Sequence, residues 1–325
     1  MLARALRLSN ALELTLYVVL AMSLCKASFI AALGLAVLAM LALRSVVIAV
    51  TYAFAGAYAS LAPRLSGRQR MLMVLGEYLS FVVTFLVIMP FERWWMGDDR
   101  LPRQVAEGQG LTAGAAGGRP PLLLIHGYGC SRACWWWLRA HLEAAGWTVA
   151  TISLEPIYTS IDNYVDPVAR RVDEVLAATG AAQLILVGHS MGGLVSRAYL
   201  QRHGDARVAR LVTLGTPHQG SELARLGFGD NGRQMRPQSP WLQALASPPA
   251  SVHTVALYSP HDNFVMPPAL LELRGAQNRV IDGIGHLAML YSPRVTQALL
   301  TVLEQTAARC RRAAIDAAEI TDAER

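Results

Sequence analysis

The chain has 325 residues, of which 53% are hydrophobic and 16% are charged, and its formal net charge is +6. The first 70 residues carry seven Lys/Arg and one Glu, a net of +6, so the remaining residues balance. Because the positive excess lies in the first 70 residues, it is typical of the flanks of membrane-spanning segments. The balanced remainder of the chain argues against a basic surface that binds nucleic acid.

Residues 1–90 are predicted to form a membrane anchor. Between Leu8 and Pro63 the charged residues are Glu13, Lys26 and Arg44, which is too few for a soluble domain of that length. A membrane span needs about 20 apolar residues, and both a buried soluble helical hairpin and a cleaved signal peptide fit this pattern less well. We predict two to three hydrophobic helices, at about 10–25, 27–62 and 71–90.

The third segment is ambiguous, because Phe81 to Met89 is strongly apolar whereas Glu77 interrupts its front half. It either spans the membrane or lies in the interface, and the tryptophans Trp94 and Trp95 that follow are typical of a membrane surface.

The positive-inside rule keeps the flanking arginines of the first two spans in the cytoplasm: Arg4, Arg7, Arg64, Arg68 and Arg70. The rest of the chain is then cytoplasmic if 71–90 is interfacial and extracytoplasmic if it spans. We favour the spanning alternative, and we expect an integral protein of a bacterial inner membrane.

A juxtamembrane segment and linker are expected over 91–119, with the Gly/Ala-rich stretch at 108–118. From 120 to 309, short apolar runs alternate with amphipathic helices, which predicts an α/β domain with a mostly parallel sheet and helices on both faces. Residues 310–325 are expected to be a C-terminal tail. The predicted strands are 121–125, 147–154, 184–187, 208–214, 252–258 and 279–282. The predicted helices are 132–145, 162–179 (N-cap Asp162 or Asn163, stop at Gly180), 192–203 and 295–308.

The pentapeptide Gly188-His189-Ser190-Met191-Gly192 lies between a predicted strand and a predicted helix. Gly-x-Ser-x-Gly in that context is the nucleophile elbow of serine hydrolases, in which a strained turn lifts the serine hydroxyl clear of the sheet. Larger side chains at the two glycines would collide with the neighbouring strand and helix. We therefore predict Ser190 as the nucleophile and the Met191 amide as one donor of an oxyanion hole.

The strand at 121–125 ends in His126-Gly127-Tyr128. A His-Gly pair after the strand that precedes the nucleophile strand typically supplies the second oxyanion donor, so we predict the Tyr128 amide in that role.

Two further strands end in candidate catalytic side chains, Asp262 after 252–258 and His286 after 279–282. The chain order Ser190, Asp262, His286 is that of α/β-hydrolases and differs from that of chymotrypsin or subtilisin. Asp230 and Asp282 are rival acids, although Asp282 is too close in sequence to His286 to approach its ring comfortably.

Three motifs carry a family resemblance. Ile125-His126-Gly127, the elbow with Gly193, and Leu214-Gly215-Thr216-Pro217-His218-Gln219-Gly220-Ser221 resemble the motifs of bacterial triacylglycerol lipases and esterases of the α/β-hydrolase superfamily, over roughly residues 120–305. The resemblance implies the α/β-hydrolase fold and hydrolysis of a carboxylic ester with an acyl chain. The stretch between Ser221 and Ser251 is short for a large lid.

The sequence thus predicts a membrane-anchored serine esterase or lipase that acts through an acyl-enzyme on a lipid or other small ester, without cofactor or metal and without nucleic acid. An acyltransferase or a lipid-anchor deacylase with the same triad is the alternative, and a non-catalytic scaffold fits poorly because the triad is intact. Cys130 and Cys134 are either a disulfide or, as we favour, small core residues. Because the α/β core is complete from about Pro120, removal of residues 1–90 is expected to retain activity on short esters.

Overall fold

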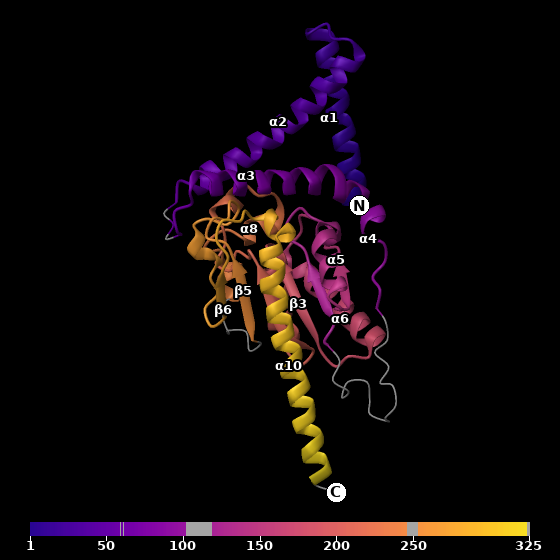
Figure 1. Cartoon of the computed structure of the whole chain (residues 1–325), viewed down its shortest axis with the longest axis vertical. Coiled ribbons are helices and arrows are strands. Elements are labelled where there is room, and N and C mark those ends of the chain that lie inside the picture. Colours follow the sequence, from indigo (N-terminus) through magenta and orange to yellow (C-terminus); the bar gives the residue numbers. More distant parts are fainter. Residues whose placement is uncertain (59, 61, 102–118, 246–252, 324–325) are drawn as a thin grey trace.

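The computed structural model describes residues 1–58, 60, 62–101, 119–245 and 253–323, so the expected linker at 108–118 lies outside the described residues. An α/β domain occupies the lower part of the molecule in Figure 1, and helices from the N-terminal region lie above it.

A six-stranded sheet forms the centre of the α/β domain, in the order β2-β1-β3-β4-β5-β6. Every neighbouring pair is parallel. The strands are β1 Leu122–Ile125, β2 Val149–Ile152, β3 Leu184–His189, β4 Val208–Leu214, β5 Thr254–Tyr258 and β6 Gln277–Val280. The expected α/β class is confirmed, and the continuous apolar run of β1 is buried along its whole length, as is typical of a parallel sheet covered on both faces.

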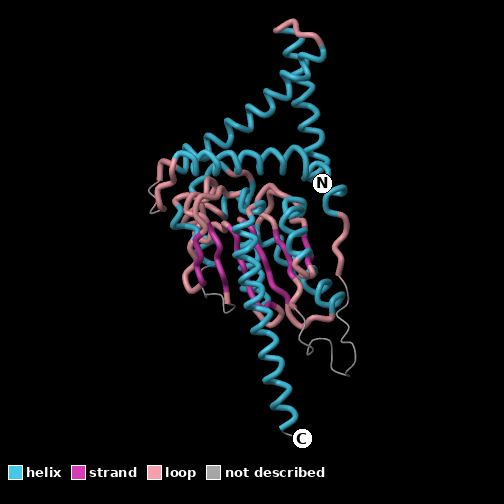
Figure 2. Tube along the Cα trace, in the orientation of Figure 1, coloured by secondary structure: helices cyan, strands magenta, loops and turns pink. Residues whose placement is uncertain are grey.

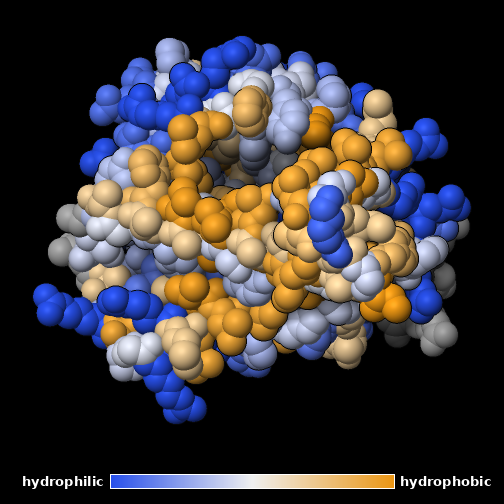
Figure 3. Space-filling model, turned by 90° about the horizontal axis from the view of Figure 1, so that it is seen from above, coloured by the Kyte–Doolittle hydropathy of each residue, from blue (hydrophilic) through white to orange (hydrophobic). Residues whose placement is uncertain are grey.

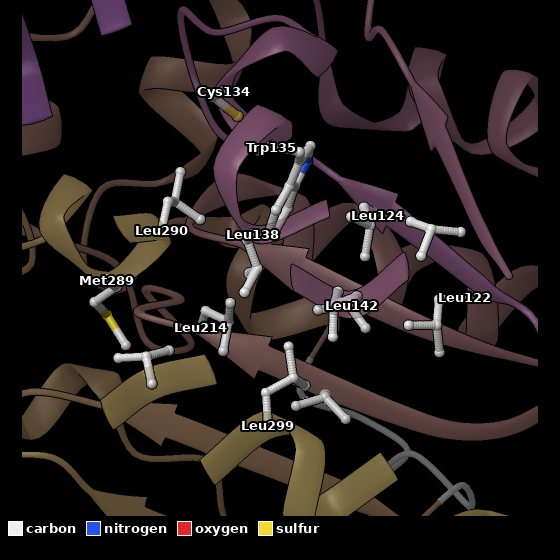
Figure 4. Close-up of a cluster of buried hydrophobic side chains, with 14 of the residues drawn as sticks. Leu122, Leu124, Cys134, Trp135, Leu138, Leu142, Leu214, Met289, Leu290 and Leu299 are labelled. Atoms are coloured by element: carbon white, nitrogen blue, oxygen red, sulfur yellow. The ribbon is translucent and has the colours of Figure 1, made fainter. Parts of the chain in front are cut away.

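Helices cover both faces of this sheet (Figure 2). The helices of the α/β domain are α5 Trp136–Ala144, α6 Val165–Thr179, α7 Met191–His203, α8 Gly229–Gln234, α9 Pro240–Leu245 and α10 Pro293–Ala323. Leu122 and Leu124 of β1 pack with side chains of α5 and α10, the core of Figure 4, whereas Leu123 and Ile125 pack with α6 and α7. The two-residue period of the strand thus divides its side chains between two cores.

Several predicted boundaries differ from the structure. The first hydrophobic helix, expected at about 10–25, begins at Leu2, and the second, expected at about 27–62, ends at Ala55. The helix expected at 162–179 is preceded by a 3-10 turn at Ile161–Tyr164, because the Ser160 hydroxyl accepts from the Asp162 amide at 3.2 Å and starts it earlier. The last strand is β6, so Asp282 lies in the loop after it. The last helix, α10, continues through most of the segment 310–325.

The N-terminal region contains α1 Leu2–Leu24, α2 Phe29–Ala55, α3 Gly67–Val82 and α4 Glu92–Met96, with a π-helical segment Val83–Ile88 after α3. Among the described residues, three helical stretches, 2–24, 29–55 and 67–96, are long and apolar enough to cross a membrane. Figure 1 shows α1 and α2 as a hairpin that rises away from the α/β domain, whereas α3 lies across the top of that domain.

The hairpin encloses an ion pair. The Arg44 guanidinium of α2 donates to the Glu13 carboxylate of α1 at 2.6 Å, and both side chains are largely buried. Charged groups within a bilayer are costly unless paired, so this contact makes the two charges compatible with a membrane hairpin.

Both ends of the hairpin contact the α/β domain. The Met1 amine bonds to Glu155 at 2.7 Å, and Thr51 near the end of α2 accepts from Asn263 at 2.8 Å. On α3, Glu77 is completely buried against the domain. Seen from above, this end of the molecule carries many apolar side chains and a hollow between them (Figure 3).

Candidate functional site

The strand order creates a crevice above β1 and β3. The strand after β1 in the chain, β2, lies on one side of it, whereas the strand after β3, β4, lies on the other. Loops at the carboxyl ends of β1 and β3 therefore diverge, which is where parallel α/β sheets bind ligands. Ser190 follows β3, and the segment from His126 to Gly129 follows β1.

Ser190 occupies a tight turn between β3 and α7, with φ 55° and ψ −126°. A positive φ is strained for a residue with a side chain. A Cβ at Gly188 would lie 2.5 Å from the amide nitrogen of Gly193, and one at Gly192 would lie 2.0 Å from the carbonyl oxygen of Ile125. Both positions therefore require glycine, for the steric reason expected from the sequence.

The loop after β1 lies against Ser190. A Cβ at Gly127 would be 2.8 Å from the Cβ of Ser190 and 3.3 Å from its Oγ. The His126 ring fixes this loop, because its Nε2 accepts from the Leu154 amide at 2.9 Å and its Nδ1 donates to the Gly127 carbonyl at 2.9 Å. Burial lowers the pKa of His126 to about 4, so the ring stays neutral in this role.

Tyr128 and Met191, the expected oxyanion donors, belong to the two segments that meet at Ser190. Tyr128 follows Gly127 directly, and Met191 is the first residue of α7, where a backbone N–H has no partner within the helix. Met191 is thus next to the serine in the chain, and Tyr128 lines the same cavity as Ser190.

His286 and Asp262 form a buried pair. The Nδ1–H of His286 donates to Oδ2 of Asp262 at 2.7 Å, which leaves Nε2 as the acceptor nitrogen of the ring. The other oxygen of Asp262 accepts from the amides of Phe264 and Val265 at 2.7 and 2.9 Å. Burial lowers the pKa of His286, but the charge and hydrogen bond of Asp262, together with Glu77 and Cys130, outweigh it, so the net shift of that pKa is upward.

The rival acids lie elsewhere. Asp230 of α8 is half-exposed and forms an ion pair with Arg233. Asp282 lines a separate cavity with Arg294, away from Ser190. Of the three aspartates considered, the structure brings Asp262 to the histidine.

A cavity of about 590 Å³ contains both Ser190 and His286. The side chains that line it are mainly apolar. Three of these lining residues come from the N-terminal region, Val47, Phe81 and Phe85. Two further lining residues, Leu226 and Phe228, are 67% and 76% exposed, so the mouth of the cavity is also apolar. The arrangement suits an ester whose acyl part is hydrophobic.

Sequence reasoning missed the part that the N-terminal helices play here. The α/β core was expected to be complete from about Pro120, yet Val47, Phe81 and Phe85 form cavity walls and Glu77 bonds to the loop after His286. Glu77 was the available signal, because a carboxylate in an apolar run must find buried polar partners. Removal of residues 1–90 would take these groups away, so the expectation that the shortened domain stays active does not fit the structure.

Two residues of the sequence motifs, His189 and Ser221, bond to the loops that carry His286 and Asp262. The neutral His189 ring donates from Nε2 to the carbonyl of His286 at 3.1 Å, and burial lowers the pKa of His189 well below the usual value. The Ser221 hydroxyl of the Thr-Pro-His motif donates to the carbonyl of Phe264 at 2.7 Å, which ties that motif to the loop of Asp262.

Cys130 and Cys134 are free and buried, and Cys134 packs in the core of Figure 4. Within the described part of the chain, no three His, Cys, Asp or Glu side chains gather in a way that could hold a metal ion.

Comparisons with known proteins agree with this architecture. Residues 120–238 match the family model of the α/β hydrolase fold. The triacylglycerol lipase of Pseudarthrobacter phenanthrenivorans is 35% identical over 114 residues, 33% of this chain and 35% of the relative. That of Burkholderia plantarii is 35% identical over 33% of this chain and 32% of its own length. The match thus spans about a third of the length of these curated relatives.

Among solved structures, the mature lipase of Bacillus licheniformis superposes with a TM-score of 0.52 at 19% identity, covering 57% of this chain and 92% of the lipase. The parallel sheet, the elbow and these matches lead to one conclusion: the chain has the α/β-hydrolase fold, and about a third of it resembles bacterial triacylglycerol lipases.

Proposed function

We propose that the chain is a membrane-anchored serine esterase or lipase that uses Ser190, His286 and Asp262. The observation that carries the proposal is that Ser190, on its strained turn, and His286, bonded to Asp262, open into one apolar cavity. The resemblance to triacylglycerol lipases supports an ester substrate.

In the proposed mechanism, Nε2 of His286 takes the proton of Ser190 as its oxygen attacks the ester carbonyl. The negative charge on the tetrahedral intermediate is stabilised by the amides of Tyr128 and Met191. His286 then gives the proton to the leaving alcohol, and water activated by the same histidine releases the acid from the acyl-enzyme. Asp262 holds the ring in the tautomer that has Nε2 free and stabilises the imidazolium.

The apolar cavity predicts a preference for longer acyl chains. Burial of one methylene contributes about 0.8 kcal/mol, or roughly fourfold in kcat/KM. We expect kcat/KM of the full-length protein in micelles to rise by at least about 100-fold from p-nitrophenyl acetate to the octanoate. A profile that is highest for acetate and falls with chain length would contradict an acyl-binding cavity, and hydrolysis no faster than the background rate would contradict an esterase.

We also propose that the α1–α2 hairpin crosses the membrane and that the catalytic domain lies on the cytoplasmic side. Both ends of the hairpin contact the α/β domain, and the turn at Cys25 and Lys26 is at the far end of the hairpin. With α3 lying across the domain, the interfacial alternative for 71–90 fits better than the spanning alternative favoured from the sequence. The positive-inside rule then keeps both arginine clusters and the catalytic domain in the cytoplasm.

Two native cysteines report this topology. Cys25 is exposed at the hairpin turn and Cys310 is partly exposed on α10. In intact spheroplasts of an expression host, a membrane-impermeant maleimide should label Cys25 and leave Cys310 unlabelled, whereas both should react after lysis. The variants Cys25→Ser and Cys310→Ser identify each signal. Labelling of Cys310 in intact spheroplasts would place the catalytic domain outside, and a protein that fractionates as soluble without detergent would refute the anchor.

A further inference from the structure

Glu77 of α3 is a buried carboxylate outside the α/β domain that bonds directly to the catalytic loop. Its side chain has no exposed surface. One oxygen accepts from the Leu287 amide at 3.0 Å and the other from the Ala288 amide at 2.8 Å. These are the two residues that follow His286, so both oxygens of Glu77 hold the backbone that carries the histidine.

A second contact reaches the same histidine from α2. The His286 amide donates to the side-chain oxygen of Asn263 at 3.1 Å, and the side-chain nitrogen of Asn263 donates to the Thr51 hydroxyl at 2.8 Å. Three consecutive backbone amides, at 286, 287 and 288, are thus held directly or through one residue by side chains of α2 and α3.

The loop is shaped to receive Glu77. A Cβ at Gly285 would lie 2.5 Å from a carboxylate oxygen of Glu77 and 2.6 Å from the Tyr52 hydroxyl, so the backbone approaches both groups more closely than any other residue would allow. A carboxylate is costly to bury without hydrogen bonds, and an apolar side chain would serve better if α3 only had to cover the domain. The backbone amides of the histidine loop explain why an acidic residue stands in this apolar run.

Glu77 also acts on the charge of His286. The titratable groups that face the imidazole are Asp262 from the loop after β5, Glu77 from α3, His189 from the end of β3 and Cys130 from the loop after β1. Of these, the two carboxylates and, to a smaller extent, Cys130 favour the imidazolium. Burial raises the pKa of Glu77 itself to about 7, so its charge is present from about that pH upward, and its loss there would lower the pKa of His286.

We propose that Glu77 is a positioning residue, and that α2 and α3 of the membrane region hold His286 where it can serve Ser190. The inference rests on the proposed esterase function and deepens it: the membrane helices are a structural part of the active site as well as its anchor. Activity then depends on correct packing of α3 against the catalytic domain.

The test compares three full-length variants in micelles. Glu77→Gln keeps the shape of the side chain but turns an NH₂ group toward one of the two amides, and Thr51→Val removes the acceptor for Asn263 at nearly constant volume. Tyr78→Phe is the matched control, since it deletes the hydrogen bond from the Tyr78 hydroxyl to the Leu41 carbonyl and touches no catalytic loop. Each variant is measured for kcat, KM, the pH dependence of kcat/KM and the melting temperature.

We expect Glu77→Gln to lower kcat by about 100-fold, because small misplacements of a catalytic group have effects of that order. KM and the melting temperature should stay close to those of Tyr78→Phe. The part of the acidic limb of kcat/KM near pH 7 and above, where Glu77 is ionised in the wild type, should move to lower pH, because the neutral histidine that acts as base persists to lower pH when its pKa falls. Thr51→Val should also lower kcat, by about tenfold, because it loosens the same loop through Asn263. If Glu77→Gln does not fold, the Thr51→Val result decides the question.

Two outcomes separate the proposals. If a fluorophosphonate fails to label wild-type Ser190 and no ester is hydrolysed, the esterase proposal is wrong. If the wild type is labelled and active but both variants have the kcat and pH profile of Tyr78→Phe, or lose kcat only in proportion to a lowered melting temperature, Glu77 has a structural role only and the positioning proposal is overturned.

Discussion

Replacement of the proposed nucleophile, Ser190→Ala, is expected to lower kcat/KM for p-nitrophenyl esters by about 10⁴-fold or more, since members of a catalytic triad act as a unit. The methyl group fills the same turn, so the fold and the melting temperature should hardly change. The measurement is the initial rate of the full-length protein in micelles, with fluorophosphonate labelling as a second readout. Labelling should occur in the wild type and be lost in the variant.

Ser196→Ala is the matched control on the same helix. Ser196 is buried in α7, and its hydroxyl donates to the Gly192 carbonyl at 2.8 Å, four residues back. This variant loses a hydroxyl and one hydrogen bond close to the elbow, yet it should keep most of its activity and its label. A Ser190→Ala protein that retains more than a tenth of wild-type activity, or that still reacts with the probe, would show that the nucleophile lies elsewhere.

The features that could be predicted from the sequence are those that a short segment determines. The elbow needs only a strand, two glycines and a helix start within a few residues, and the structure shows the close approaches at Gly188 and Gly192 that exclude side chains. The strands of the α/β domain were found for the same reason, since a short apolar run between turns has few alternatives. The pairing of Asp262 with His286 followed from chain order, because successive parallel strands bring their carboxyl ends to one edge.

The arrangement of the N-terminal helices could not be predicted, because hydropathy does not distinguish lipid from a protein surface. Phe81 and Phe85 are apolar whichever they face, and in the structure they line the cavity of Ser190. Length and composition alone also allow the stretch 67–96 to cross a membrane. Contacts of Glu77 with Leu287 and Ala288, more than 200 residues away in the chain, hold α3 on the α/β domain, and hydropathy gives no sign of them.

These contacts add a second proposed role for the N-terminal helices to that of an anchor. An anchor raises the effective concentration of the enzyme at a membrane, and that role needs only apolar length. A cavity wall and a support for His286 need specific side chains at specific positions. The structure shows such side chains on α2 and α3, so the candidate site is formed by two regions that composition alone would assign to different domains.

The second large effect is expected at the proposed acid. Asp262→Asn should lower kcat by about 10⁴-fold, as the loss of the orienting carboxylate does in serine proteases. The amide oxygen can still accept from Phe264 and Val265, which turns the NH₂ group toward Nδ1 of His286. That nitrogen must then be the acceptor, so the proton moves to Nε2 and the ring can no longer take the proton of Ser190. The fold is retained because the variant differs by one atom type.

Asp230→Asn and Asp282→Asn are the matched controls, and both should keep kcat within about threefold of the wild type because their surroundings leave them outside the cavity of Ser190. The three variants are compared by kcat on one ester, with fluorophosphonate labelling rates as the independent measure of nucleophile activation. A large loss in Asp230→Asn or Asp282→Asn, together with a mild effect of Asp262→Asn, would mean that the histidine uses another acid during turnover. Because the buried Asp262 carboxylate is also the main group that raises the pKa of His286, its replacement should lower that pKa as well, so the residual activity should extend to lower pH than that of the wild type.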